Sequence, residues 1–407
     1  MSTQAHIQTK PATVRRLRID VPLLLIVACL VVFGLLMVYS SSWDIAWLAD
    51  KGPAHIFTKQ IVWVFVGTLL ATAASYFDYH RIPKLVVPMM FMLWILLLAV
   101  LVINRFEFGA IRGLVGGSVQ PAEFAKMGIV LYLAVWLNNR QEIDSNFKFG
   151  LLSLIAVVGV VAILIGLQPD FSAAGTIFLL GIMMFFIGGG DLRQLFIPFG
   201  IAAGALIFAI NFVETVKVRV DEYLSLIRNP KEGSFHILRT YEAVIKGRLF
   251  GVGIGNANTK FTGLPLPHTD SIFAVIAEET GLMGSFFVIL LYVLLLWRGY
   301  VIAKKAPDTL GKLISFGLIG WIVFEALLNI AVIVGLFPMA GNALPFISAG
   351  GSSMISTLIA IGIVMNVARQ GETKESLERS QGNATVDLRG RDWRRSVSRT
   401  NRYTEIE

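Results

Sequence analysis

Few ionisable side chains interrupt the long apolar stretches of this sequence, and those that do lie beside prolines, glycines and small polar residues. The first such group runs from Arg112 to Lys126, and its Pro121 suits the first turn of a helix. Glu123 and Lys126 would then share one helical face, within reach of an ion pair. Charged groups inside a bilayer are costly and usually functional, so we expect this pair to organise a site. The alternative is a pair that only caps a helix near the membrane interface.

A second group is the turn Gln168-Pro169-Asp170, which lies between two apolar runs. The carboxylate of Asp170 can accept a hydrogen bond from the first turn of the following helix, as N-cap aspartates do. We favour this structural role over a chemical one.

The third group is the richest in polar residues. Closely spaced glycines from Gly247 to Gly255 would let backbone amides approach a ligand, including the oxygens of a phosphate group. Four basic side chains near them in the sequence favour an anion site: Arg239, Lys246, Arg248 and Lys260. The segment His268-Thr269-Asp270 follows, just before an apolar run resumes at Ser271. Asp270 is therefore either the N-cap of the helix formed by that run or a catalytic residue.

The fourth group, residues 335–353, is broken by Pro338, Pro345 and several glycines, and it contains Ser352. Lipid cannot satisfy the backbone of such a segment at membrane depth, so the segment must line a cavity or be buried within protein. Its small residues also permit close packing of helices.

The elements that position these groups follow from composition. The chain has 407 residues, 55% of them hydrophobic and 15% charged, whereas a soluble domain carries about 25% charged residues. The apolar residues form runs of roughly 20, the length that crosses a hydrocarbon core. We predict an all-α polytopic membrane protein with about ten transmembrane helices, at residues 21–41, 56–76, 85–103, 121–138, 150–167, 171–188, 192–213, 271–297, 313–337 and 349–368. The tight turn at 168–170 leaves one alternative, a single broken helix, which would reverse the orientation of everything after it.

Lysines and arginines in short loops set the orientation, because they favour the cytoplasmic side. With the N-terminus inside, 13 of them lie on its side and 4 on the opposite side. Both termini are then cytoplasmic, and the long loop 214–270 is extracytoplasmic. The formal charge of +8 reflects these topology signals and a basic tail rather than a nucleic-acid partner. The single cysteine, Cys29, lies inside the first run and permits no intrachain disulfide.

We divide the chain into a cytoplasmic N-terminal arm (1–20), a ten-helix transmembrane domain (21–368) and a cytoplasmic tail (369–407). The tail is polar, with six arginines near its end, and has too little apolar surface to fold alone. We expect a disordered arm attracted to anionic lipid headgroups, in preference to a specific docking site. The first apolar run follows three arginines but is too long for a signal peptide, so we interpret it as an uncleaved helix.

Together the four groups resemble the SEDS family (shape, elongation, division and sporulation), whose members include FtsW, RodA and SpoVE. The resemblance covers roughly residues 20–370 and depends most on the third and fourth groups. Residues 346–348 and the start of the chain look more like FtsW than like RodA. The resemblance implies an inner-membrane peptidoglycan glycosyltransferase that polymerises lipid II for cell division or elongation, with the division septum as one expected location. It also implies a class B penicillin-binding protein, a transpeptidase, as partner, together with other membrane proteins of the division or elongation machinery.

The resemblance further implies which residues do the chemistry. Asp270 matches the essential aspartate of the family, so it is the candidate general base for the hydroxyl of the acceptor sugar. The lipid diphosphate would be bound by cations and neighbouring polar groups: Arg112, Glu123, Lys126, Arg239, Lys246, Arg248, Lys260, His268 and Ser352. A divalent cation, Mg²⁺ or Mn²⁺, could bridge the diphosphate, although the sequence contains no metal-ligand motif. No organic cofactor is expected.

The sequence departs from the family pattern at Gly113 and Ala349, where the family has aromatic residues, and this bears on how the substrate packs. Two other functions remain open. One is a lipid II flippase, because sparse membrane charges and broken helices are also typical of transporters. The other is a non-catalytic scaffold of a division complex. We find no internal repeat to support a transporter, and the richest polar group lies on one outer face rather than at the midplane.

Overall fold

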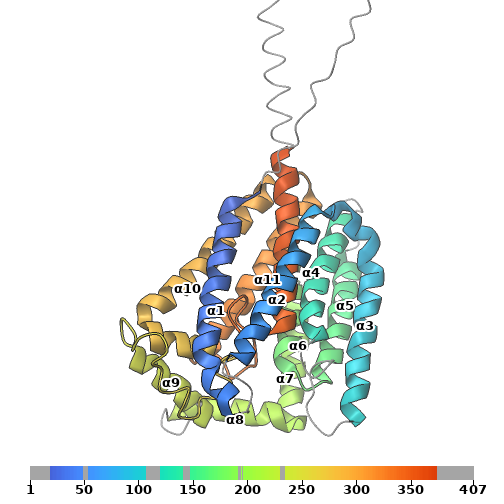
Figure 1. The fold of residues 1–407 in the computed structure, drawn as a ribbon. Coiled ribbons are helices and arrows are strands. Elements are labelled where there is room, and N and C mark those ends of the chain that lie inside the picture. Colours follow the sequence, from blue (N-terminus) through green and yellow to red (C-terminus); the bar gives the residue numbers. More distant parts are fainter. Residues whose placement is uncertain are drawn as a thin grey trace, which may run out of the picture.

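The computed structural model describes residues 19–48, 54–106, 120–140, 147–190, 194, 196–229 and 234–373. Every regular element within these ranges is a helix, so the all-α fold class predicted from the sequence is confirmed. Arg112, the first 18 residues and the tail from residue 374 onwards lie outside the described residues. The helices form a bundle, with the first and last described residues at the same end (Figure 1).

Ten helices coincide with the ten predicted apolar segments: α1 (Val21–Leu48), α2 (His55–Tyr76), α3 (Ile82–Phe106), α4 (Pro121–Arg140), α5 (Phe147–Gly166), α6 (Phe171–Ile187), α7 (Phe196–Phe212), α10 (Ile272–Lys305), α11 (Thr309–Ile333) and a C-terminal helix (Gly351–Thr373). A short 3-10 helix, η1 (Tyr79–Arg81), precedes α3. Two more helices lie in the predicted extracytoplasmic loop, α8 (Glu214–Arg228) and α9 (Phe235–Gly247).

The length and apolarity of the described helices identify a multi-pass membrane protein. Six of these helices are long and apolar enough to cross a membrane, or up to seven if α7 and α8 form one span with a bend of 98°. The apolar helix α6 is shorter than these. Ten spans therefore stay a prediction, although each predicted segment is a helix.

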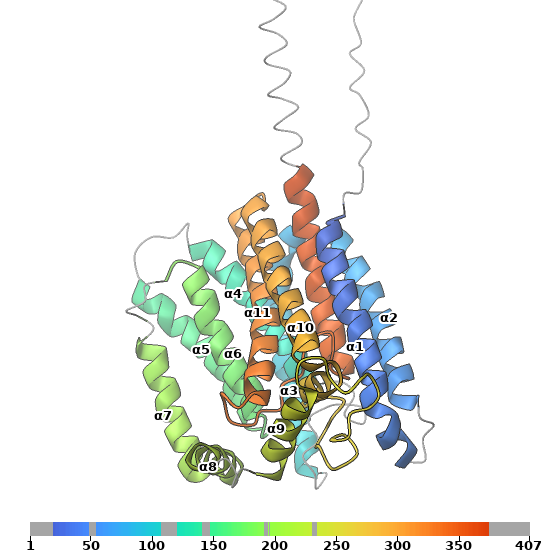
Figure 2. The same ribbon diagram turned by 90° about the vertical axis from the view of Figure 1, so that its left-hand side faces the viewer.

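The turn at residues 168–170 separates two helices. α5 ends at Gly166, α6 begins at Phe171, and the two lie side by side in both views (Figures 1 and 2). Asp170 is the N-cap of α6, since its Oδ1 accepts a hydrogen bond from the backbone N–H of Ala173 at 3.2 Å. The hairpin and the capping role are both confirmed, and the single broken helix is excluded.

The centre of the bundle is formed by α11 and the C-terminal helix. In each of them 72% of the apolar window is buried, compared with 11% in α2, whose side chains mostly face outward. α11 packs against α4, α6 and α10, and its Trp321 is fully buried. Small residues allow close approach elsewhere, because a Cβ added to Gly362 would lie 2.2 Å from the carbonyl oxygen of Ala71 in α2.

α10 is broken near its start at Gly281, whose φ of 68° and ψ of −164° lie outside the helical region. The loop that follows α9 packs into the break. The N–H of Val252 donates to the carbonyl oxygen of Glu278 at 2.9 Å. The N–H of Gly253 donates in the same way to Glu279 at 3.0 Å.

The same loop also completes the other side of the break. Its carbonyl oxygens at Arg248 and Leu249 accept hydrogen bonds from the N–H groups of Leu282 and Met283, at 2.9 and 3.1 Å. In an unbroken helix those N–H groups would donate to carbonyls four residues earlier, so the loop supplies both missing partners. The glycine-rich loop that we expected to present amides to a ligand thus uses two of them to repair a helix.

Candidate active site

A polar cavity of about 380 Å³ lies at the end of the bundle where the C-terminal helix begins. Side chains and backbone from all four groups singled out in the sequence line it: Glu123 and Lys126, Asp170, Thr269 and Asp270, and residues 341–343 and 349–353. Segments far apart in the chain therefore converge on one place. Of the two predicted places for the fourth group, a cavity wall or the protein interior, residues 341–343 and 349–353 occupy the first.

Four helices begin at this cavity. Glu123 lies in the first turn of α4, Asp170 caps α6, Asp270 directly precedes the cap of α10, and Ser352 lies in the first turn of the C-terminal helix. The N-terminal end of a helix carries partial positive charge and N–H groups without partners in the helix, so it favours anions. The arrangement suits a negatively charged group such as a phosphate, even though three carboxylates also line the cavity.

Lys126 is the buried cation of this site, with 2% of its side chain exposed. Its Nζ donates a hydrogen bond to Glu123 Oε1 at 2.8 Å and a second one to Glu325 Oε1. The predicted pairing of Glu123 with Lys126 is confirmed. The other oxygen of Glu123 is buried and has no hydrogen-bond partner among the described residues.

Glu325 of α11 is a site residue that the sequence reasoning missed. Its Oε2 accepts a hydrogen bond from Trp321 Nε1 at 2.9 Å, one helical turn away, and its side chain is 1% exposed. A glutamate inside an apolar run is itself a signal of function. That signal marks Glu325 as important, but only the packing of α11 against α4 shows that its partner is Lys126.

Backbone hydrogen bonds to the fourth group hold Asp270 in place. α10 begins at Ile272 with Ser271 as its N-cap, one residue beyond Asp270. The carbonyl oxygen of Asp270 accepts a hydrogen bond from Asn329 Nδ2 at 3.0 Å, and the same amide donates to the carbonyl oxygen of Asn342 at 2.6 Å. One side chain of α11 thus fixes both cavity-lining loops.

Ser348 makes the second link between these loops. Its Oγ donates to the carbonyl oxygen of Thr269 at 2.7 Å and accepts from the N–H of Leu344 at 2.7 Å. The N–H of Ala349 donates to the carbonyl oxygen of His268 at 2.9 Å. Hydrogen bonds within the protein therefore satisfy backbone groups of the broken segment, as its place at membrane depth requires.

The four basic residues expected beside the glycines do not line this cavity. Arg239 and Lys246 both pair with Glu242 on α9, at 2.5 and 2.7 Å, and these two cations lower the pKa of that carboxyl. Arg248 is exposed and ends α9 with a φ of 46°. The side chain of Lys260 is 5% exposed, and its Nζ donates to Glu279 Oε1 at 2.9 Å.

The other expected site residues occupy different positions. Ser352 lines the cavity. His268 contributes its backbone carbonyl to the loop contact described above, and burial lowers the pKa of its imidazole. The sequence reasoning did not select His236 of α9, whose Nε2 lies 2.8 Å from Ser271 Oγ beside Asp270.

A helical bundle that gathers a buried lysine, an aspartate and four helix N-termini around one cavity is a multi-pass membrane protein with a polar site at one end of the bundle. The comparisons with known proteins give its family. Residues 21–373 match the Cell cycle protein family of FtsW, RodA and SpoVE, and the chain belongs to it.

Curated relatives match over nearly their whole length. The chain is 32% identical over 365 residues to Stage V sporulation protein E of Bacillus subtilis, covering 88% of this chain and 99% of that protein. It is 34% identical over 360 residues to the probable peptidoglycan glycosyltransferase FtsW of Trichlorobacter lovleyi, with coverages of 86% and 93%.

Solved structures agree with this assignment. A chain of a peptidoglycan synthase complex that coordinates polymerization and crosslinking matches with a TM-score of 0.69 and 29% identity, covering 87% of this chain and 98% of that one. The crystal structure of the rod shape determining protein RodA of Thermus thermophilus matches with a TM-score of 0.64 and 27% identity, with coverages of 87% and 98%.

Proposed function

We propose that this chain is a peptidoglycan glycosyltransferase that polymerises lipid II into glycan strands at the outer face of the cytoplasmic membrane. The observation that carries the proposal is the convergence of Asp270, Lys126 and four helix N-termini on one cavity. Relatives named as probable peptidoglycan glycosyltransferases match most of the chain. The activity is therefore argued from both the site and the family.

In the proposed reaction Asp270 is the general base. It removes the proton from the 4-hydroxyl of the acceptor sugar, whose oxygen attacks the anomeric carbon of a glycan chain joined to lipid diphosphate. A glycosidic bond forms, the bond to the diphosphate breaks with inversion, and the lipid diphosphate leaves with the bonding electron pair. General-base catalysis of this kind typically contributes about 10²–10⁴-fold.

The departing diphosphate gains negative charge, which the cavity is built to stabilise. The helix N-termini supply positive charge without rearrangement, because the fold already holds them in position. The ammonium of Lys126 adds to this charge, although it is shared with Glu123 and Glu325. In this account Glu123 and Glu325 are positioning residues that hold Lys126 Nζ at the cavity wall.

A divalent cation stays an open element of the proposal. The described residues contain no group of three or more His, Cys, Asp or Glu side chains placed to hold a metal ion, so the chain does not supply a ligand set in this part of its length. We therefore assign no step to a metal ion.

The proposed topology follows from the loop charges and the family. Both termini would be cytoplasmic, and the cavity and the loop 214–270 would be extracytoplasmic. The partner would be a class B penicillin-binding protein, and the division septum is one location where the pair would act. Impermeant labelling of cysteines introduced at Lys231 and Asn383 tests the orientation. We expect labelling at the first position alone in intact cells, and labelling at both would refute the topology.

The test of function uses purified full-length protein, its partner and fluorescent lipid II. Glycan polymer is expected from the wild type. Transbilayer movement of lipid II without polymer would identify a flippase instead, and neither outcome would identify a scaffold. An inactive transpeptidase variant of the partner is a useful control, because it removes crosslinking while leaving polymerisation to this chain.

A further inference from the structure

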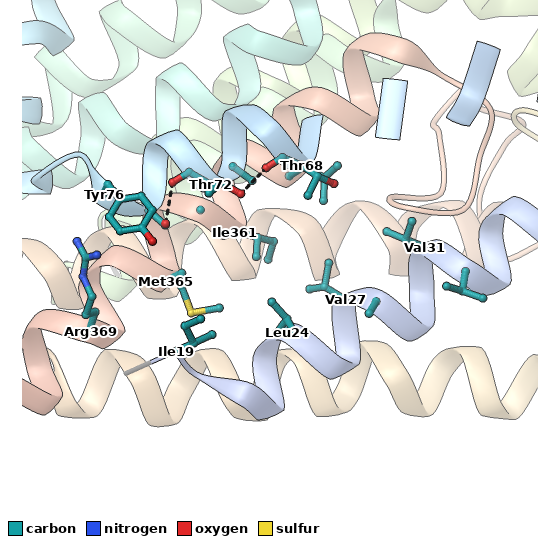
Figure 3. A pocket seen from close by; sticks show the side chains of 16 residues that line it. Ile19, Leu24, Val27, Val31, Thr68, Thr72, Tyr76, Ile361, Met365 and Arg369 are labelled. Atoms are coloured by element: carbon teal, nitrogen blue, oxygen red, sulfur yellow. Dashed lines mark hydrogen bonds between the residues drawn. The ribbon is translucent and has the colours of Figure 1, made fainter. Parts of the chain in front are cut away.

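A second cavity, also of about 380 Å³, opens between α1, α2 and the C-terminal helix. Leu24, Val27 and Val31 of α1 line one wall, and Ile361 and Met365 of the C-terminal helix line the facing one (Figure 3). We call this cavity the α1–α2 groove. Leu24 is half exposed, so the groove opens sideways to the surrounding membrane.

Two of the hydroxyl groups in the groove wall, those of Thr72 and Ser75, donate hydrogen bonds within α2. Thr72 Oγ1 donates to the carbonyl oxygen of Thr68 at 2.8 Å, and Ser75 Oγ donates to that of Thr72 at 2.8 Å (Figure 3). The hydroxyl protons of Thr72 and Ser75 are therefore already used inside the helix. The groove therefore favours an apolar chain over a polar molecule along most of its length.

Arg369 lies at one end of the groove and supplies a positive charge there. Its guanidinium lies 5.0 Å from the ring centre of Tyr76, and it makes no ion pair within the described part of the chain. The nearby carboxylate of Asp20 is occupied by Arg298, with Nη2 and Oδ2 2.7 Å apart.

We propose that the α1–α2 groove binds one anionic glycerophospholipid, with an acyl chain along α1 and the headgroup phosphate at Arg369. Basic sites between transmembrane helices at a membrane surface bind anionic headgroups. A guanidinium also matches the geometry of a phosphate and can donate two parallel hydrogen bonds to it. An apolar groove that ends at an arginine without an ion pair among the described residues fits this class of lipid.

The lipid-linked substrate is a poorer occupant because of distance. Ser353 lines the candidate active site, and Arg369 follows it 16 residues later on the same helix. At a rise of 1.5 Å per residue they are about 24 Å apart along the axis, most of the thickness of a hydrocarbon core. Arg369 therefore lies at the opposite membrane surface, where the described chain begins and ends (Figure 1).

Native mass spectrometry of the full chain, titrated with phosphatidylglycerol or phosphatidylcholine, tests the proposal. We expect one tightly bound phosphatidylglycerol and weaker binding of phosphatidylcholine. Arg369→Gln should lower the affinity for phosphatidylglycerol about five-fold, since one basic side chain near a headgroup contributes about that factor. Arg369→Lys keeps the charge but not the two parallel donors, so its affinity should lie between those of the wild type and Arg369→Gln. Lys304→Gln, which removes an exposed cation at the same end of the bundle, is the control and should bind like the wild type.

A second pair of variants tests the groove itself. Ala28→Trp fills the groove, whereas Leu25→Trp places the same ring on an exposed position of α1 that does not line it. Phosphatidylglycerol should be lost from the first variant and retained by the second. Equal affinity for the two lipids, unchanged binding in Arg369→Gln, or displacement of phosphatidylglycerol by undecaprenyl phosphate would each overturn the proposal.

Discussion

Ser348 Oγ donates a hydrogen bond of 2.7 Å to the carbonyl oxygen of Thr269, the residue directly before the candidate base. This contact joins two loops that are 79 positions apart in the chain. The loop that carries Asp270 is therefore held in place by a side chain from the segment 335–353.

Ser348→Ala tests this coupling. The change removes the hydroxyl that bridges Thr269 and Leu344, and leaves a partly buried carbonyl and a buried N–H without this partner. We expect a loss of about 1–3 kcal/mol in the free energy of unfolding and a fall in polymerisation, since unmade buried hydrogen bonds cost about that much. Thermal unfolding and the lipid II assay on the same sample measure both. Unaltered activity would show that Asp270 does not depend on the link.

The buried charges around Lys126 predict an order of stabilities. Lys126→Ala leaves the carboxylates of Glu123 and Glu325 buried without their cation, and should cost about 3–5 kcal/mol together with polymerisation. Glu325→Gln leaves one cation with one carboxylate, so it should be the milder change. Arg239→Ala breaks a partly exposed pair with Glu242 and should cost at most about 1 kcal/mol. Unfolding midpoints in a single detergent rank the three, and the reverse order of the two buried variants would contradict the account.

The repaired break in α10 predicts different costs for two glycines in one loop. Gly251 has a φ of 79°, and an added Cβ would lie 2.1 Å from the carbonyl oxygen of Glu279. Gly255 has a φ of 89° but nothing within 4 Å of such an atom. Gly251→Ala should therefore destabilise the protein much more than Gly255→Ala. In Gly255→Ala the only cost is the positive φ, whereas Gly251→Ala adds a steric clash. Similar unfolding midpoints would mean that the loop does not fill the break tightly.

The pH dependence of stability should carry a contribution from His268. Burial lowers the pKa of its imidazole, so the folded protein resists protonation at this residue while the unfolded chain takes up a proton below about 6.5. Stability should thus fall as the pH drops below that value. His268→Gln removes the contribution, so its melting temperature should fall less between pH 7 and pH 5 than that of the wild type. Parallel pH profiles would show that His268 is not responsible.

Sequence spacing predicted much of the fold and part of the site. Apolar runs of membrane length located ten helices, and the i, i+3 spacing predicted the pair of Glu123 and Lys126. Spacing along one segment could not predict that Glu325 joins this pair, because the partnership depends on how α11 packs against α4.

The glycine-rich loop shows the limit of motif reasoning more clearly. Its glycines were interpreted as a phosphate cradle, yet their lack of side chains serves a close backbone contact with broken α10. Lys260 was expected to bind an anionic ligand, and its charge is instead paired with Glu279. Basic residues close together in sequence are thus assigned to a ligand only when their acidic partners in space are known.

The most direct test of the account is polymerisation of lipid II by Asp270→Asn. Asparagine is nearly isosteric with aspartate, but it cannot take up a proton near neutral pH. We predict normal insertion, stability and partner binding, with polymerisation lowered at least about 10²-fold. The control is Asp308→Asn, at the N-cap of α11 and outside the cavity lining, which should retain activity. Near wild-type polymerisation by a well-folded Asp270→Asn protein would contradict the assignment of Asp270 as the base.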